Sequence, residues 1–253
     1  MSSNSNLLQI LDQISAKDVF EFETSKGERY MFRLLTTAQM REMVKMIVDS
    51  PLSQIGFIKA VANVIRESAV QKVDVETFSI VDRMLFMLEL RINSLSAVIK
   101  IGETEVNLKE VVAKIRDVIR TESAAFQPID VTYNQLVARL SIPSISTEIF
   151  LNGALTQDPK KLVAETPTEI QKVLGEVFIH ELAKVIEYIQ VGEEQTKFQG
   201  LTVQERVAIV EKLPAGLTKT ILGYVEKYKR LLDGCLQVAD DVVVPMDGTL
   251  FSV

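Results

Sequence analysis

The chain has 253 residues, of which 47% are hydrophobic and 25% are charged, and its formal net charge is −6. This composition is typical of a folded globular protein and excludes a disordered one, which combines low hydrophobicity with high net charge. The acidic balance also argues against nucleic-acid binding through phosphate contacts, because that mode needs an excess of clustered Lys and Arg.

Cysteine content and hydropathy bear on the compartment. The single cysteine, Cys235, excludes an intramolecular disulfide and a cysteine-only metal site, and it fits a reducing compartment. The N-terminal residues lack the basic region and apolar core of a secretory signal. The most apolar run, Met84 to Leu88, is interrupted by Glu89 and Arg91 and falls short of the roughly 20 residues of a membrane span. We therefore expect no membrane association.

The first 35 residues predict a short helix followed by a β-hairpin. Phe20 and Phe22 alternate with the acidic Glu21 and Glu23, and Tyr30 and Phe32 alternate with Met31 and Arg33 further on. The residues 25–27, Ser-Lys-Gly, supply the turn between the two predicted strands.

Four helices and a second hairpin are predicted in the rest of the N-terminal half. The third of these helices is apolar almost all round, which is typical of a core element. The hairpin turns at Gly102 and leads into the fourth helix. The helices are expected to begin at a Thr36 cap, near Leu52, at a Ser79 cap and at an Asn107 cap.

After residue 124 the pattern changes to a mixture of strands and helices. Residues 128–142 predict a hairpin with its turn at Tyr133-Asn134, and residues 146–166 are open between loops and two short helices. A long amphipathic helix is predicted from Thr168 to Gly192, with Leu174, Phe178 and Leu182 in its apolar stripe. Helices from Thr202 and around residues 217–232 follow, and residues 242–251 are expected to add one strand.

These elements predict an α+β fold that is predominantly α-helical with small antiparallel β hairpins. We place a domain boundary near residue 124, which gives an N-terminal region of hairpin plus helices (1–124) and a C-terminal helical region with short strands (125–253). A single domain over the whole chain remains the alternative.

The sequence offers no catalytic, cofactor-binding or metal-binding centre that we can identify. The one histidine, His180, is expected on a solvated polar stripe with Glu176 and Lys184. The string from His180 to Lys184 imitates a zinc-protease motif, but a lysine stands where the second metal ligand is needed. Glycine-rich phosphate loops are absent from the sequence, and the acidic pairs at residues 193–194 and 240–241 are expected in solvated turns.

Two features of the sequence fit either a folding role or a partner-binding role. Most methionines precede residue 90, where they either fill a core or line an adaptable partner groove. Arg91 lies on a helix with little polar surface, so that either it pairs internally or a partner supplies the acid.

Four short stretches, in this order, resemble the baseplate hub assembly proteins of T-even-like contractile-tailed phages. The second begins with an acidic residue and ends in the pattern Leu-Arg-x-x-Ser. The arginine of this pattern is Arg91 and its serine is Ser94. The stretches are Phe32–Gln39, Asp82–Ser94, Thr104–Leu108 and Leu201–Pro214. Some relatives carry a cysteine pair after the second stretch and this chain does not, so a zinc-stabilised variant of the fold is not expected.

The resemblance implies a non-enzymatic assembly chaperone, made in the host bacterial cytoplasm, that binds hub or central baseplate proteins. Arg91 and Ser94 carry over as family-signature residues, with a folding role and a partner-binding role both open. A structural baseplate or tail component present in the virion is the alternative. An unrecognised carboxylate hydrolase is a third hypothesis, which requires two acids with perturbed ionisation at one concave site.

Overall fold

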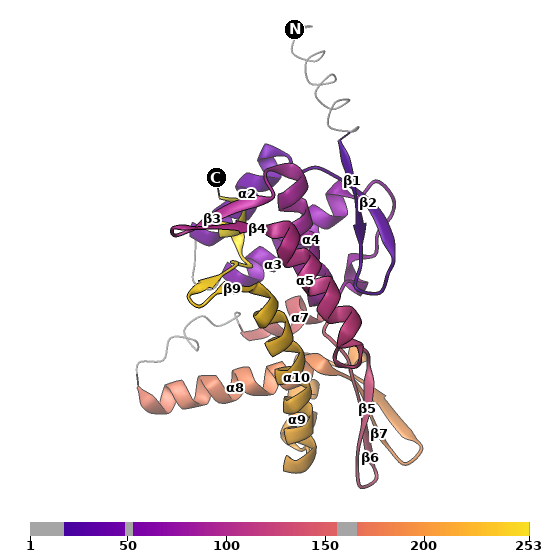
Figure 1. Cartoon of the computed structure of the whole chain (residues 1–253). Coiled ribbons are helices and arrows are strands. Elements are labelled where there is room, and N and C mark those ends of the chain that lie inside the picture. Colours follow the sequence, from indigo (N-terminus) through magenta and orange to yellow (C-terminus); the bar gives the residue numbers. More distant parts are fainter. Residues whose placement is uncertain (1–17, 49–52, 156–165, 253) are drawn as a thin grey trace, which may run out of the picture. The chain divides into compact units, whose positions relative to one another are not determined.

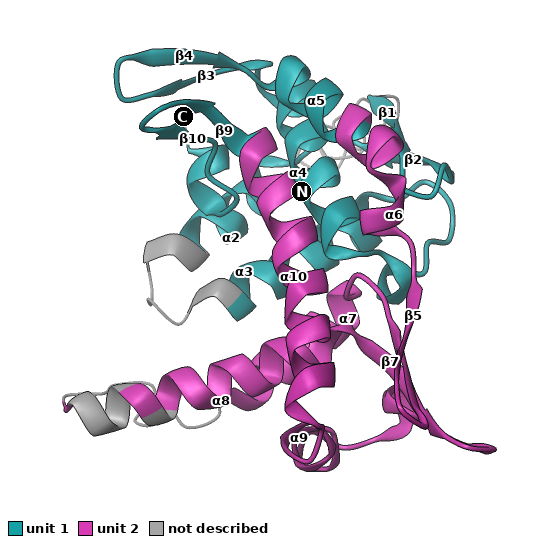
Figure 2. Ribbon diagram, turned by 60° about the horizontal axis from the view of Figure 1, so that its bottom comes forward, with its two compact units in different colours: residues 1–116, 236–253 teal, residues 117–235 magenta. Residues whose placement is uncertain are grey.

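A computed structural model describes residues 18–48, 53–155 and 166–252 of the chain (Figure 1). By its internal contacts the chain divides into two compact units, coloured separately in Figure 2. Unit 1 consists of residues 1–116 and 236–253, and unit 2 consists of residues 117–235. These units are defined by contacts and not by independent folding, so the domain boundary near residue 124 stays a prediction.

Unit 1 contains helices and three two-stranded hairpins. Its second chain segment returns from the C-terminal end and places the 3-10 helix η4 against α2. The elements are β1 (Val19–Glu23), β2 (Arg29–Arg33), α2 (Thr37–Val48), α3 (Ser53–Ser68), η1 (Val75–Thr77), α4 (Ile80–Ser94), β3 (Val98–Ile101), β4 (Thr104–Asn107), the larger part of α5 (Leu108–Thr121), β9 (Gln237–Ala239), β10 (Val242–Val243) and η4 (Gly248–Phe251).

The core of unit 1 is built on aromatic side chains, as the alternation in its first hairpin predicts. The β1–β2 pairing sets Phe20 opposite Phe32 and leaves Phe22 on the same face. These three rings gather around Phe86 of α4, with the Phe32 and Phe86 centroids 4.8 Å apart in an edge-to-face arrangement. Such pairs add about 0.5–1.5 kcal/mol beyond the area that they bury, so the hairpin is fixed to α4.

Unit 2 combines helices with a four-stranded antiparallel sheet whose strand order is β5-β6-β7-β8. Helices α7, α8 and α9 pack against one another within this unit. The elements are α6 (Ser123–Phe126), β5 (Ile129–Tyr133), β6 (Leu136–Leu140), α7 (Ile145–Leu155), α8 (Pro167–Val185), β7 (Ile186–Val191), β8 (Glu194–Lys197), η3 (Phe198–Gly200), α9 (Val203–Glu211) and most of α10 (Ala215–Leu236).

The described residues confirm the predicted α+β class, with helices predominant and small antiparallel sheets. The predicted hairpins at residues 20–32, 98–107 and 128–142 are present, and so are the caps at Thr36, Ser79 and Thr202. The helix expected before the first hairpin and the second short helix before residue 166 lie outside the described residues.

Two predicted elements differ in extent from those in the structure. The long helix does not reach Gly192, because α8 ends at Val185 and the chain continues directly as strand β7. Gly192 instead lies in the β7–β8 turn with a φ of 60°. The strand expected within residues 242–251 is present but short, since β10 pairs with β9 over two residues and η4 follows.

Candidate functional site

Arg91 is buried and its guanidinium is satisfied inside unit 1. The side chain is 6% exposed, its Nε donates to the Leu250 carbonyl at 2.9 Å, and its Nη1 donates to the Ser96 carbonyl at 3.0 Å. Burial lowers the pKa of Arg91, although the two carbonyls accept its hydrogens. Arg91 therefore pairs internally, with backbone rather than with an acid, and it attaches η4 to the end of α4.

Ser94, the second signature residue, is half-buried at the end of α4. Its Oγ accepts a hydrogen bond of 2.8 Å from the backbone N–H of Leu35, in the connection between β2 and α2. Both signature residues thus make contacts that hold unit 1 together. Their role in partner binding stays a prediction.

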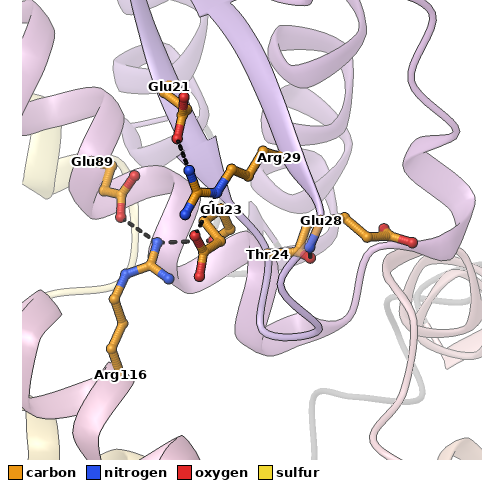
Figure 3. A network of polar contacts seen from close by, with 7 residues as sticks. All are labelled: Glu21, Glu23, Thr24, Glu28, Arg29, Glu89 and Arg116. Atoms are coloured by element: carbon orange, nitrogen blue, oxygen red, sulfur yellow. Dashed lines mark hydrogen bonds and ion pairs between the residues drawn. The ribbon is translucent and has the colours of Figure 1, made fainter.

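A polar network connects the first hairpin with α4 and α5 on unit 1 (Figure 3). The Arg116 Nη2 donates to the Glu89 carboxylate at 2.6 Å and to the Glu23 carbonyl at 2.8 Å. Arg29 pairs across the hairpin with Glu21 and Glu23, at 3.2 and 2.9 Å. Burial raises the pKa of Glu89, and the attraction of Arg116 only partly offsets that effect. The network thus connects β1 and β2 with α4 and α5.

His180 is buried, so the predicted solvated stripe is wrong at this position. The side chain is 8% exposed, and Nδ1 lies 2.8 Å from the Glu176 carbonyl oxygen. Because a carbonyl only accepts hydrogen bonds, Nδ1 carries the hydrogen. Lys184, also largely buried, forms an ion pair with Glu181, which also pairs with Lys229 of α10 at 2.6 Å. Glu181, next to His180, thus connects α8 with α10.

The ionisation of Glu181 differs from that of Glu89. Burial tends to raise the pKa of Glu181, but Lys184 and Lys229 together outweigh it and leave the pKa below its usual range. The group is therefore a stable anion between two cations. In the described part of the chain, His, Cys, Asp and Glu form no group of three or more that could hold a metal ion.

Exposed apolar side chains are found on two helices of unit 2. Leu174 and Phe178 are 61% and 38% exposed, and they are neighbours four residues apart on α8. On α7, the ring of Phe150 is 42% exposed. The sequence places Leu174 and Phe178 in a stripe with the buried Leu182, so that the structure covers one end of this stripe and leaves the other open. A pair of adjacent exposed apolar residues is more informative than scattered ones.

Arg206 on α9 is the functional candidate that the sequence reasoning missed. Its side chain is 6% exposed, and its guanidinium carbon lies 4.8 Å from the ring centroid of Phe150. Within the described residues we find no ion pair or side-chain hydrogen bond for this guanidinium, and its Nε is enclosed without a partner. The available signal was an arginine three residues after the apolar Val203 and four before Val210, which is helical spacing.

No protein-family model, curated protein or solved structure matches this chain. Over residues 18–48, 53–155 and 166–252, none of the helices has both the length and the apolar character needed to span a bilayer. The candidate site is therefore defined by its residues: the exposed Leu174 and Phe178, and the Phe150–Arg206 pair.

Proposed function

We propose that this chain is a non-enzymatic assembly chaperone that binds hub or central baseplate proteins of a contractile-tailed phage in the host bacterial cytoplasm. The observation that carries a binding function is the open apolar surface of unit 2, in which Leu174 and Phe178 are adjacent on α8 and exposed. The partner's identity rests on the sequence resemblance.

The four stretches that carry the resemblance coincide with complete structural steps. The first leads from β2 into α2 and ends in the Thr36–Gln39 cap, and the second comprises most of α4. The third leads from β4 into α5, and the fourth begins at the capping box of α9.

An enzymatic function has less support. Among the groups of the described residues, the carboxylates found with a shifted pKa are Glu89 in unit 1 and Glu181 and Glu205 in unit 2. Glu89 is held by Arg116, Glu181 lies between two lysines, and Glu205 is the exposed capping partner of Thr202. Each shifted acid has a structural role, whereas a hydrolase needs two of them facing one substrate.

The proposal is tested by affinity purification of the tagged chain from infected cells. Hub or central baseplate proteins are expected to co-purify with it, and the chain is expected to be absent from finished virions by quantitative mass spectrometry. Stoichiometric presence in purified particles would instead establish the alternative, a structural baseplate or tail component. Recovery of no baseplate protein would refute both.

A pair of matched variants tests the proposed surface. Leu174→Ser combined with Phe178→Ser should reduce co-purification and leave the thermal unfolding midpoint nearly unchanged, because exposed side chains contribute little to stability. Val243→Ser is the control, since Val243 is 53% exposed but lies in unit 1. Equal recovery of partner by both proteins would show that the α8 surface is not the binding face.

A further inference from the structure

Two arginines of this chain are equally buried, at 6% exposure each, but only one is satisfied by the fold. Arg91 donates to two backbone carbonyls. Arg206 has the ring of Phe150 as its observed neighbour and no acceptor among the described residues. Burial lowers the pKa of Arg206.

A buried charge without a counter-charge is costly, since its lost hydration is not replaced. In helix α9 the position of Arg206 has the spacing of an apolar residue, because Val210 one turn later is buried. Contact with an aromatic ring recovers only a part of the lost hydration. No contact that Arg206 makes within residues 18–48, 53–155 and 166–252 explains the arginine, whereas an acceptor supplied by a partner does.

The surroundings of Arg206 indicate which acceptor fits. Phe150 is 42% exposed, so the guanidinium of Arg206 lies beside an exposed apolar side chain. Phosphate sites commonly gather several cationic or N–H donors. A single guanidinium suits one carboxylate, which it binds with two parallel hydrogen bonds.

We propose that Arg206 and Phe150 form an anchor site for one Asp or Glu side chain of a partner protein segment, with an apolar neighbour of that acid packing on the Phe150 ring. This inference rests on the proposed function in so far as the partner is a protein. It adds the chemistry of the contact: an acid next to an apolar residue, bound at the junction of α7 and α9.

The binding test uses the full-length chain and a display library of short random peptides as the probe. Enriched peptides are expected to share an Asp or Glu beside an apolar residue, and their affinity should fall about tenfold or more in Arg206→Met. Phe150→Ser should weaken the same peptides. Arg120→Met is the control, because Arg120 is an exposed arginine of unit 2, and it should leave their affinity unchanged.

Other results of the binding test contradict the proposal. Enrichment of peptides without an acid, or no enrichment at all, overturns it. So does Arg206-dependent binding of inorganic phosphate without binding of acidic peptides, which would assign the site to a free anion.

A stability measurement tests whether the fold itself satisfies Arg206. Arg206→Met should unfold at the same or a higher temperature than the parent chain, because it removes an unpaired buried charge, whereas Arg91→Met should unfold at a lower temperature. A loss in Arg206→Met as large as that in Arg91→Met would show that the fold itself satisfies Arg206, and the proposal would fail. The peptide and stability results do not depend on hub proteins, so they distinguish failure of the anchor site from failure of the proposed function.

Discussion

Arg91 is a residue whose importance the sequence indicated and whose role the structure defines. The sequence left open an internal pair or a partner's acid, because an arginine on an apolar helix fits both. The acceptors are carbonyls of Ser96 and Leu250, and Leu250 is far away in the chain. A backbone acceptor leaves no signature in the side-chain pattern, so that residue types alone could not have identified it.

We predict that Arg91→Ala destabilises the chain by about 2 kcal/mol or more, since it leaves the buried Leu250 carbonyl and the part-buried Ser96 carbonyl without this donor. Urea unfolding measures the change. Arg41→Ala is the control: Arg41 is 77% exposed on α2 of the same unit, and a change within about 0.5 kcal/mol is expected. An Arg91→Ala variant of parental stability that lost partner binding would place Arg91 in the interface instead.

Glu89 and Glu181 are predicted to respond to pH in opposite directions. The pKa of Glu89 is higher in the folded chain than in the unfolded chain, so the folded chain binds more protons at this group. The contribution of Glu89 to the free energy of unfolding therefore falls as the pH rises above about 4.5. The folded chain lowers the pKa of Glu181, so its stabilisation is complete above about 4.5 and is lost as the pH falls below that value.

Urea unfolding over a series of pH values tests this pair. Relative to the parent chain, Glu89→Gln should gain stability as the pH rises through the raised pKa. Glu181→Gln should lose stability over the lower range as the pH rises, because only the ionised glutamate attracts Lys184 and Lys229. Parallel profiles for the two variants and the parent would contradict both assignments.

Among the elements, hairpins and capped helices could be predicted from sequence, and the α8–β7 junction could not. The hairpins have short-range signals: alternating aromatics and a glycine with positive φ, such as Gly27 and Gly102. At the junction, Ile186 and Ile189 are both buried at a spacing of three, which imitates a helix. A register shift explains that spacing, because Leu140 pairs with Ile186 whereas Arg139 pairs with Tyr188, and one extra residue of β7 interrupts the alternation.

The same limit applies to the candidate site. Periodicity grouped Leu174, Phe178 and Leu182 on one stripe of α8, but the length over which a neighbour covers that stripe is a tertiary property. Leu182 is buried and Leu174 is exposed although both have the same residue type. The sequence therefore predicted which residues form the surface but not which of them are exposed. For Arg206 it showed only a charged residue at an apolar position of a helix.

The start of α10 packs closely against the β5–β6 hairpin, and a glycine makes this possible. A Cβ at Gly216 would lie 2.4 Å from the ring of Tyr133, whereas one at Gly223 of the same helix meets nothing within 4 Å. Alanine is the better helix former by about 1 kcal/mol. We predict that Gly223→Ala stabilises the chain and that Gly216→Ala does not, because the ring must move.

Thermal unfolding of the two alanine variants measures this difference. Combining Gly216→Ala with Tyr133→Ala should recover the stabilising effect of alanine, relative to Tyr133→Ala alone. Equal stabilisation by both single substitutions would show that Tyr133 makes no packing contribution at Gly216.

At the scale of the whole molecule, unit 1 is built from two segments that are far apart in the chain. Its C-terminal segment contributes the buried Val244, Leu250 and Phe251, and η4 packs on α2. The sequence pattern divided the chain once, near residue 124, because composition and periodicity change there. A return of the last residues to the first unit depends on long-range contacts, which local patterns do not contain.

We predict that removing residues 237–253 unfolds unit 1. Three buried apolar side chains at about 1.5–3 kcal/mol each amount to much of the stability of a typical domain. Amide hydrogen exchange should show lost protection in α2 and α4 and retained protection in the β5–β8 sheet. Intact protection in α2 and α4 would mean that unit 1 is complete without its C-terminal segment.

The hydrogen bond between Arg91 and Leu250 also has a consequence for the order of synthesis. Translation delivers residues 1–116 first, and then spends on the order of ten seconds on Asp117 to Cys235 before the rest of unit 1 emerges. Throughout this interval the face of α2 that receives η4 is open to water. The usual sequence of events on the ribosome is therefore reversed, and the unit encoded first is the last that can close.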